Sequence, residues 1–209
     1  MSIPVDQAVY RVRRFFRKSD MPKKYQYSLE LTDDRTQQVM ATCDLVGKAT
    51  FTTLTIVDRQ HLTWQVKPNR KIMPSRWVVT DPRQHIAMQF DQKILEKLVN
   101  PLYRAVLVML DGEEKEICRL IDPRTNIPDR LLGARPDELL ILAGDRVVAK
   151  LVSLPRQEDQ PTRFWGKLKA FLATSDRGII STGGNHALPA PVALGMFMIA
   201  DDLIKTRGD

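Results

Sequence analysis

The sequence predicts a mainly β protein: a closed antiparallel barrel of about twelve strands around a buried hydrophobic helix near its C-terminal end. The apolar segment at residues 188–204 (LPAPVALGMFMIADDLI) carries the prediction of the helix. Residues 190–200 contain no charged or hydrogen-bonding side chain, and a helix that is apolar on every side has to be buried on every side. The run is too short for the ~20 residues that span a bilayer, so we expect the helix, over residues 189–206, inside the barrel.

Alternating apolar and polar residues predict the strands. Residues 39–45, 62–66 and 86–90 each place apolar side chains on one face and polar ones on the other, the pattern of a sheet with one face on a core. Turn-forming residues recur between such runs, at 33–36, 46–48, 58–60, 81–84, 111–112 and 144–145. Their spacing is typical of an antiparallel all-β domain. No repeat or linker divides residues 25–209, which we expect to form one barrel domain.

Two further helices are predicted. The first is predicted over residues 4–18, where arginines lie on the side opposite to the apolar residues. The apolar residues fall at helical spacing, at Val5, Ala8, Val9, Val12, Phe15 and Phe16. Residues 1–24 are therefore expected to form a basic amphipathic helix or arm. The second helix follows Asp91, a suitable N-cap, and ends before Asn100 and Pro101.

The positive charge is concentrated in that arm. Residues 1–24 contain seven Lys and Arg against Asp6 and Asp20, whereas the formal net charge of the whole chain is +7. Positive and negative charges are nearly equal in number over residues 25–209. A strongly basic surface is therefore expected to begin at the N-terminal arm.

The element order and three segments of the sequence resemble the tubby-like superfamily, in its phospholipid-scramblase and LURP-one-related branches. The segments are WQVKPNRKIMPSRWVVTD (64–81), ILEKLVNPLYRAVLVMLDGEEKEICRLID (94–122) and ELLILAGDRVVAKLVSLPR (138–156), followed by the terminal APVALGMFMIADDLIK (190–205). The resemblance covers residues 25–206 and implies a twelve-stranded barrel around an enclosed C-terminal helix. It also implies binding or translocation of phospholipids. A Pro-rich arm, clustered cysteines and a calcium loop, as in animal scramblases, are not visible.

The sequence favours no catalytic or metal chemistry. It has no nucleophile motif of the G-x-S-x-G kind, and the histidines His61, His85 and His186 lack ligand spacing. Cys43 and Cys118 are too few for a disulfide framework, and we interpret Cys43 as a small buried side chain. We expect no enzyme activity, no cofactor and no metal ion.

The candidate sites are therefore basic and apolar surfaces that bind anionic phospholipid head groups. Candidate head-group ligands are Arg11, Arg13, Arg14, Arg17, Lys18, Lys67, Arg70, Lys71, Arg163 and Lys167, and candidate membrane contacts are Phe15 and Phe16. The chain begins without a secretory h-region. We expect a cytoplasmic protein that can attach peripherally to the inner membrane surface.

Alternative interpretations remain open at this stage. The N-terminal helix can pack on the outside of the barrel with its arginines solvated, and residues 67–71 (KPNRK) can be an ordinary solvated loop. Residues 163–172 (RFWGKLKAFL) can form strands with core-facing aromatics. The function can also be lipid translocation, nucleic-acid binding or the binding of a protein partner.

Overall fold

The computed structural model describes residues 7–18, 25–72, 74–93, 105–124, 136, 138–153, 177–182 and 188–205. Strands dominate these residues, and one long helix follows them. In chain order the elements are β1 (Gln7–Lys18), β2 (Tyr25–Asp33), β3 (Val39–Val46), the 3-10 turn η1 (Ala49–Phe51), β4 (Leu54–Asp58), β5 (Thr63–Pro68), β6 (Arg76–Thr80), β7 (Ile86–Asp91), β8 (Ala105–Leu110), β9 (Glu116–Ile121), β10 (Glu138–Ala143), β11 (Arg146–Ser153), β12 (Arg177–Thr182) and α4 (Ala190–Lys205). The prediction of a mainly β protein with a C-terminal helix is confirmed.

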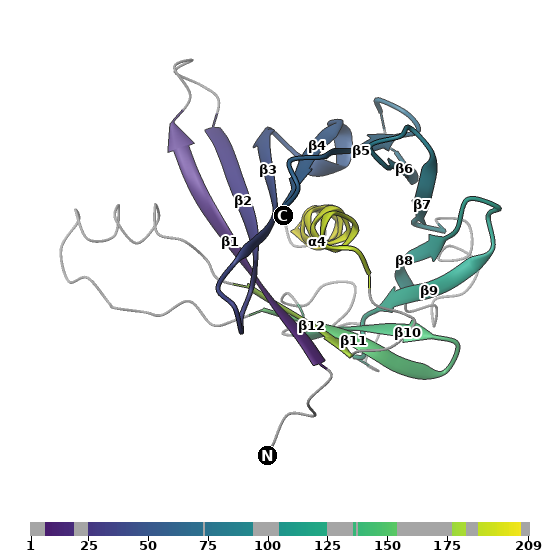
Figure 1. Ribbon diagram of the computed structural model, residues 1–209. Helices are drawn as coiled ribbons and strands as arrows, with labels where there is room; N and C mark the ends of the chain where they lie inside the picture. Colours follow the sequence, from purple (N-terminus) through teal and green to yellow (C-terminus); the bar gives the residue numbers. More distant parts are fainter. Residues whose placement is uncertain are drawn as a thin grey trace.

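The strands form one antiparallel sheet that meets itself. Each strand pairs with the next along the chain, and β1 pairs with β2 on one edge and with β12 on the other. Val12 is aligned with both Leu31 and Arg177. Figure 1 shows the resulting ring of strands, viewed nearly along the axis of α4.

Helix α4 lies in the middle of this ring (Figure 1), and residues 191–200 are all buried. Its side chains join one apolar cluster with the inward side chains of the strands, such as Leu31, Val66 and Phe90. The helix lies close to the sheet at Gly195, where an added Cβ would lie 3.0 Å from Cγ2 of Val66 and 3.3 Å from Cδ1 of Ile56. A glycine at this position therefore lets the helix and the sheet pack together closely.

The prediction of an N-terminal helix is wrong, because residues 7–18 form strand β1. Val12 is buried, while Arg11 and Arg13 on either side of it are only half-buried. Tyr10 also packs against the core, so Tyr10 and Val12 repeat every two residues as strands require. Val, Tyr and Phe favour strands, and pairing with β2 and β12 selects that conformation. The N-terminal segment is therefore part of the barrel rather than a separate arm.

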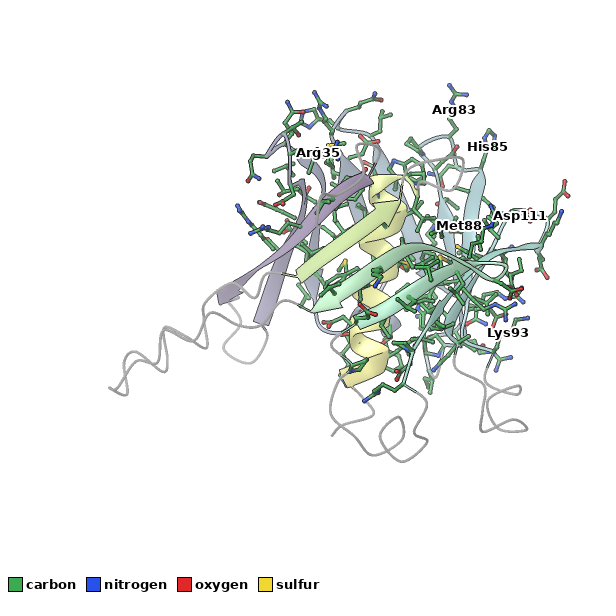
Figure 2. All side chains as sticks on the ribbon, turned by 90° about the horizontal axis from the view of Figure 1, so that it is seen from below. Arg35, Arg83, His85, Met88, Lys93 and Asp111 are labelled. Carbon is green, nitrogen blue, oxygen red and sulfur yellow. The ribbon has the colours of Figure 1, made fainter. Side chains whose placement is uncertain are left out.

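The two ends of the barrel differ in their connections. At one end, here called the hairpin end, short turns at 34–38, 59–62, 81–85, 111–115 and 144–145 join the strands, and α4 begins. At the other, the loop end, lie residues 47–53 and 69–75, residues 92–93 and 122–124 that directly follow β7 and β9, and the C-terminus of α4. Figure 2 shows Arg35, Arg83 and His85 together at the top and Lys93, which follows β7, toward the bottom.

Three of the hairpins share one turn built on an aspartate, at residues 58–62, 81–85 and 111–115. In the second, Oδ1 of Asp81 accepts hydrogen bonds from the backbone N–H of Arg83 (2.9 Å) and of His85 (2.8 Å). Asp58 and Asp111 bond the equivalent N–H groups two and four residues on. The fourth residue of each turn has a positive φ, at His61 (61°), Gln84 (65°) and Glu114 (65°). The aspartate thus satisfies amides that the tight turn leaves without strand partners.

The Gly195→Val substitution tests the enclosure of α4. Overpacking a closely packed core typically costs about 1–3 kcal/mol, because neighbouring side chains must leave their preferred rotamers. We expect a loss of this size in the free energy of unfolding, measured by urea denaturation. Ala190→Val, at the half-buried start of the helix, is the control and should cost less. Equal stability of the two variants would contradict the close approach at Gly195.

The aspartate turns are tested with Asp81→Ala and Asp81→Asn. Alanine removes the acceptor of two hydrogen bonds, each contributing about 0.5–1.5 kcal/mol, so the free energy of unfolding should fall by roughly 1–2 kcal/mol. Asparagine retains an Oδ1 acceptor and should preserve most of the stability. If the two variants were destabilised equally, the carboxylate would act through its charge instead.

Candidate anion-binding face

Two neighbouring connections at the loop end form one surface. Residues 47–53 join β3 to β4, residues 69–75 join β5 to β6, and Leu54 is aligned with Val66 where β4 and β5 pair. The connection at 47–53 is also tied to β6, the strand that follows residues 69–75, because Nε1 of Trp77 donates a 2.9 Å hydrogen bond to the carbonyl oxygen of Thr50. We call this surface the loop face. Its exposed charged and large apolar residues are Lys48, Phe51, Lys67, Arg70, Lys71 and Ile72.

The loop at 69–75 is closed at its base by Asn69. Oδ1 of Asn69 accepts hydrogen bonds from the backbone N–H groups of Ser75 (3.3 Å) and Arg76 (3.2 Å). The backbone N–H of Asn69 donates to the carbonyl oxygen of Arg76 at 2.8 Å. Pro74 is buried. With the base fixed in this way, residues 70–72 project from the barrel, and Ile72 is 79% exposed.

The cations of the loop face have no acidic partner among the described residues. Within the described part of the chain, Lys48, Lys67, Arg70 and Lys71 form no ion pair. Arg76, at the start of β6, is different: it bonds Asp91 at 3.1 Å and Glu114 at 2.7 Å. Exposed cations without internal partners are available to a phosphate group from outside.

The described residues at the two ends of the barrel carry opposite net charge. Residues 33–38, 58–62, 81–85, 111–115 and 144–145 at the hairpin end contain eight carboxylates and four cations. At the loop end, the described residues of the connections (47–53, 69–72, 74–75, 92–93 and 122–124) contain five cations and one carboxylate, Asp122. The adjoining ends of the strands and of α4 add the cations Lys67 and Arg76 and the carboxylates Asp91, Glu138, Asp201 and Asp202, so cations outnumber carboxylates by seven to five among these residues. An anionic ligand or surface is therefore attracted to the loop end and repelled by the hairpin end.

The centre of the loop end does not suit an anion. The C-terminus of α4 lies there, and it carries the negative end of the helix dipole. Asp201 is buried at 2% exposure, and Oδ2 of Asp202 accepts a 3.1 Å hydrogen bond from the backbone N–H of Thr50. Anions are therefore expected at the rim of this end, on the loop face.

The structure separates the residues that the sequence suggested as ligands. Arg11 forms a 3.0 Å ion pair with Asp34 near the hairpin end, and Arg13 is half-buried on β1. Lys67, Arg70 and Lys71 lie together and exposed on the loop face. Arg14, Phe15, Phe16, Arg17 and Lys18 belong to β1 rather than to a helix. Arg163 and Lys167, like residues 94–100 of the predicted middle helix, lie outside the described residues.

Sequence reasoning missed Lys48, Phe51 and Ile72. Ile72 directly follows the basic residues 67–71, and an isoleucine in a turn-like basic segment was the available signal. Phe51 is distant from them in sequence. Only the pairing of β4 with β5 brings it to the same surface.

The two thiols are buried in the core, and burial raises the pKa of Cys43 and of Cys118 to about 12. The carboxylates of Asp44 and Glu116 contribute the smaller part of this increase. Thiolate is the reactive form, so neither cysteine is a nucleophile near neutral pH. Among the described side chains, no group of three or more His, Cys, Asp or Glu is placed to hold a metal ion.

The comparisons with known proteins define no family. No family model matches the sequence, and no curated protein matches it. A solved X-ray structure of a protein from Arabidopsis thaliana is similar, with 13% sequence identity and a TM-score of 0.46 over 93% of this chain and 91% of the other. Among the described helices, none has the length and apolar character needed to cross a membrane.

The burial of the thiols is tested with a thiol-reactive dye at pH 8. Neither of the two cysteines should react with the native protein within minutes, because almost no thiolate is present and the dye has no access. Both should react once the protein is unfolded in urea. Rapid labelling of the native protein would contradict the positions of Cys43 and Cys118.

Proposed function

We propose that this protein is a non-enzymatic barrel that binds anionic phospholipid head groups at the inner membrane surface, through the loop face. The observation that carries the proposal is the group of four exposed cations without ion-pair partners in the described structure, placed beside exposed Phe51 and Ile72. Cations flanking apolar side chains are typical of surfaces that bind anionic bilayers.

The charge is sufficient for reversible attachment. Each Lys or Arg near an anionic membrane contributes about 1 kcal/mol, so the four cations together supply roughly 4 kcal/mol, a factor of about a thousand in affinity. These charges are exposed and therefore screened by salt. Binding should be peripheral, reversible and weaker at high ionic strength.

The fold supports a tubby-like assignment as part of this proposal. The strands follow one another around an enclosed C-terminal helix, the arrangement that the sequence resemblance implies. A nucleic-acid backbone would also suit the cations of the loop face. Exposed apolar side chains at the same surface favour lipid over a fully charged polyanion.

The proposal is tested by co-sedimentation with phosphatidylcholine vesicles that do or do not contain phosphatidylserine. Lys67→Gln, Arg70→Gln and Lys71→Gln, combined in one variant, remove three charges from the loop face. At about 1 kcal/mol for each charge, binding to the anionic vesicles should weaken by roughly a hundredfold. Neutral vesicles should bind neither protein.

A matched variant controls for net charge. Arg59→Gln, Arg83→Gln and Lys115→Gln remove three exposed cations from the hairpin end and should leave binding nearly unchanged. Equal loss in both variants would show that only net charge matters. Absence of binding to any vesicle, with salt-sensitive retardation of RNA, would replace the lipid proposal with nucleic-acid binding.

A further inference from the structure

From the loop face we infer an orientation on the membrane: the barrel docks with its loop end down, and the side chains of Ile72 and Phe51 insert into the bilayer interface. This inference rests on the proposed function and adds apolar insertion to the binding of head groups. The occupant is an anionic lipid bilayer.

Ile72 is unusual among the apolar side chains. It is 79% exposed, whereas the other large exposed hydrophobic residues of the described structure are 42–47% exposed. It lies at the tip of a loop whose base is closed by Asn69, directly after Arg70 and Lys71. An apolar side chain held outward in water gains free energy by entering a lipid phase.

Phe51 is held beside this loop by a fixed support. The preceding residue, Thr50, donates its backbone N–H to Asp202 on α4 and accepts a hydrogen bond from Trp77 on β6. The backbone N–H of Phe51 itself donates to the carbonyl oxygen of Lys48 at 3.3 Å. Because the turn is already ordered, insertion of the 45% exposed ring requires little further loss of conformational entropy.

The charges select this end of the barrel over the other. Apolar side chains are also exposed at the hairpin end, at Val39, Leu62, Ile86 and Val147. Those side chains lie at the end where the hairpin residues contain eight carboxylates and four cations, which an anionic surface repels. At the loop end, the exposed apolar side chains of Phe51 and Ile72 and the neighbouring cations both favour contact with an anionic bilayer.

The orientation is tested with an environment-sensitive fluorophore attached to single introduced cysteines, using full-length protein. The buried Cys43 and Cys118 should leave the introduced thiol as the reactive one. Labels at Ile72→Cys and Phe51→Cys should shift to the blue on phosphatidylserine-containing vesicles and be quenched by a quencher placed in the acyl chains. A label at Leu62→Cys, on the hairpin end, should show neither change.

Affinity gives an independent measurement. Ile72→Ser should weaken binding to the same vesicles by roughly tenfold, since the free energy of burying part of an isoleucine is lost, whereas Leu62→Ser should not. Binding of the native chain with an unshifted label at residue 72 would overturn the insertion and leave head-group binding intact. No binding of the native chain to any anionic vesicle would overturn both.

Discussion

An apolar helix that must be shielded from water on every side is the constraint on which this structure depends. Residues 191–200 of α4 are buried, and the inward side chains of the surrounding strands form one cluster with them. The contact at Gly195 shows how closely the helix fits, since a single Cβ would meet Val66 and Ile56. Because the helix occupies the interior, the outside surface and the two ends remain available to meet other molecules.

The same constraint makes the two ends unequal. Antiparallel strands that follow one another around a ring send alternate connections to opposite ends. Here the five short hairpins fall at one end, and the longer connections at 47–53 and 69–75 fall at the other together with the C-terminus of α4. Longer connections are less constrained by pairing and commonly carry binding residues on a rigid scaffold. The loop face on β3–β6 follows this pattern, with its turn η1 anchored to the helix through Thr50 and Asp202.

Patterns within short windows of the sequence predict the elements whose side chains alone determine which face is buried. The alternation of apolar and polar side chains indicates the strands around Cys43, Val66 and Met88, and the uninterrupted apolar residues 190–200 indicate α4. Strand β1 was mistaken for a helix because Val9, Val12 and Phe16 also satisfy helical spacing. The choice between the two depends on pairing of Val12 with Leu31 and with Arg177, contacts that no window of sequence contains. Phe51 escaped prediction for the same reason, since its place beside residues 69–75 arises from pairing between strands.

The excess of carboxylates at the hairpin end follows from the hydrogen bonds that the backbone of a tight turn requires. A tight hairpin leaves amides without partners, and an aspartate at its first position satisfies two of them, as Asp58, Asp81 and Asp111 do. Carboxylates therefore collect where the hairpins are. In the loops at 47–53 and 69–75 the amides bond to Asn69, to backbone carbonyl groups and, at Thr50, to Asp202 of α4. Within the described residues, Lys48, Arg70 and Lys71 of these loops form no ion pair. The difference in charge between the described residues of the two ends, on which the proposed docking depends, thus follows in part from how each end satisfies its own hydrogen bonds.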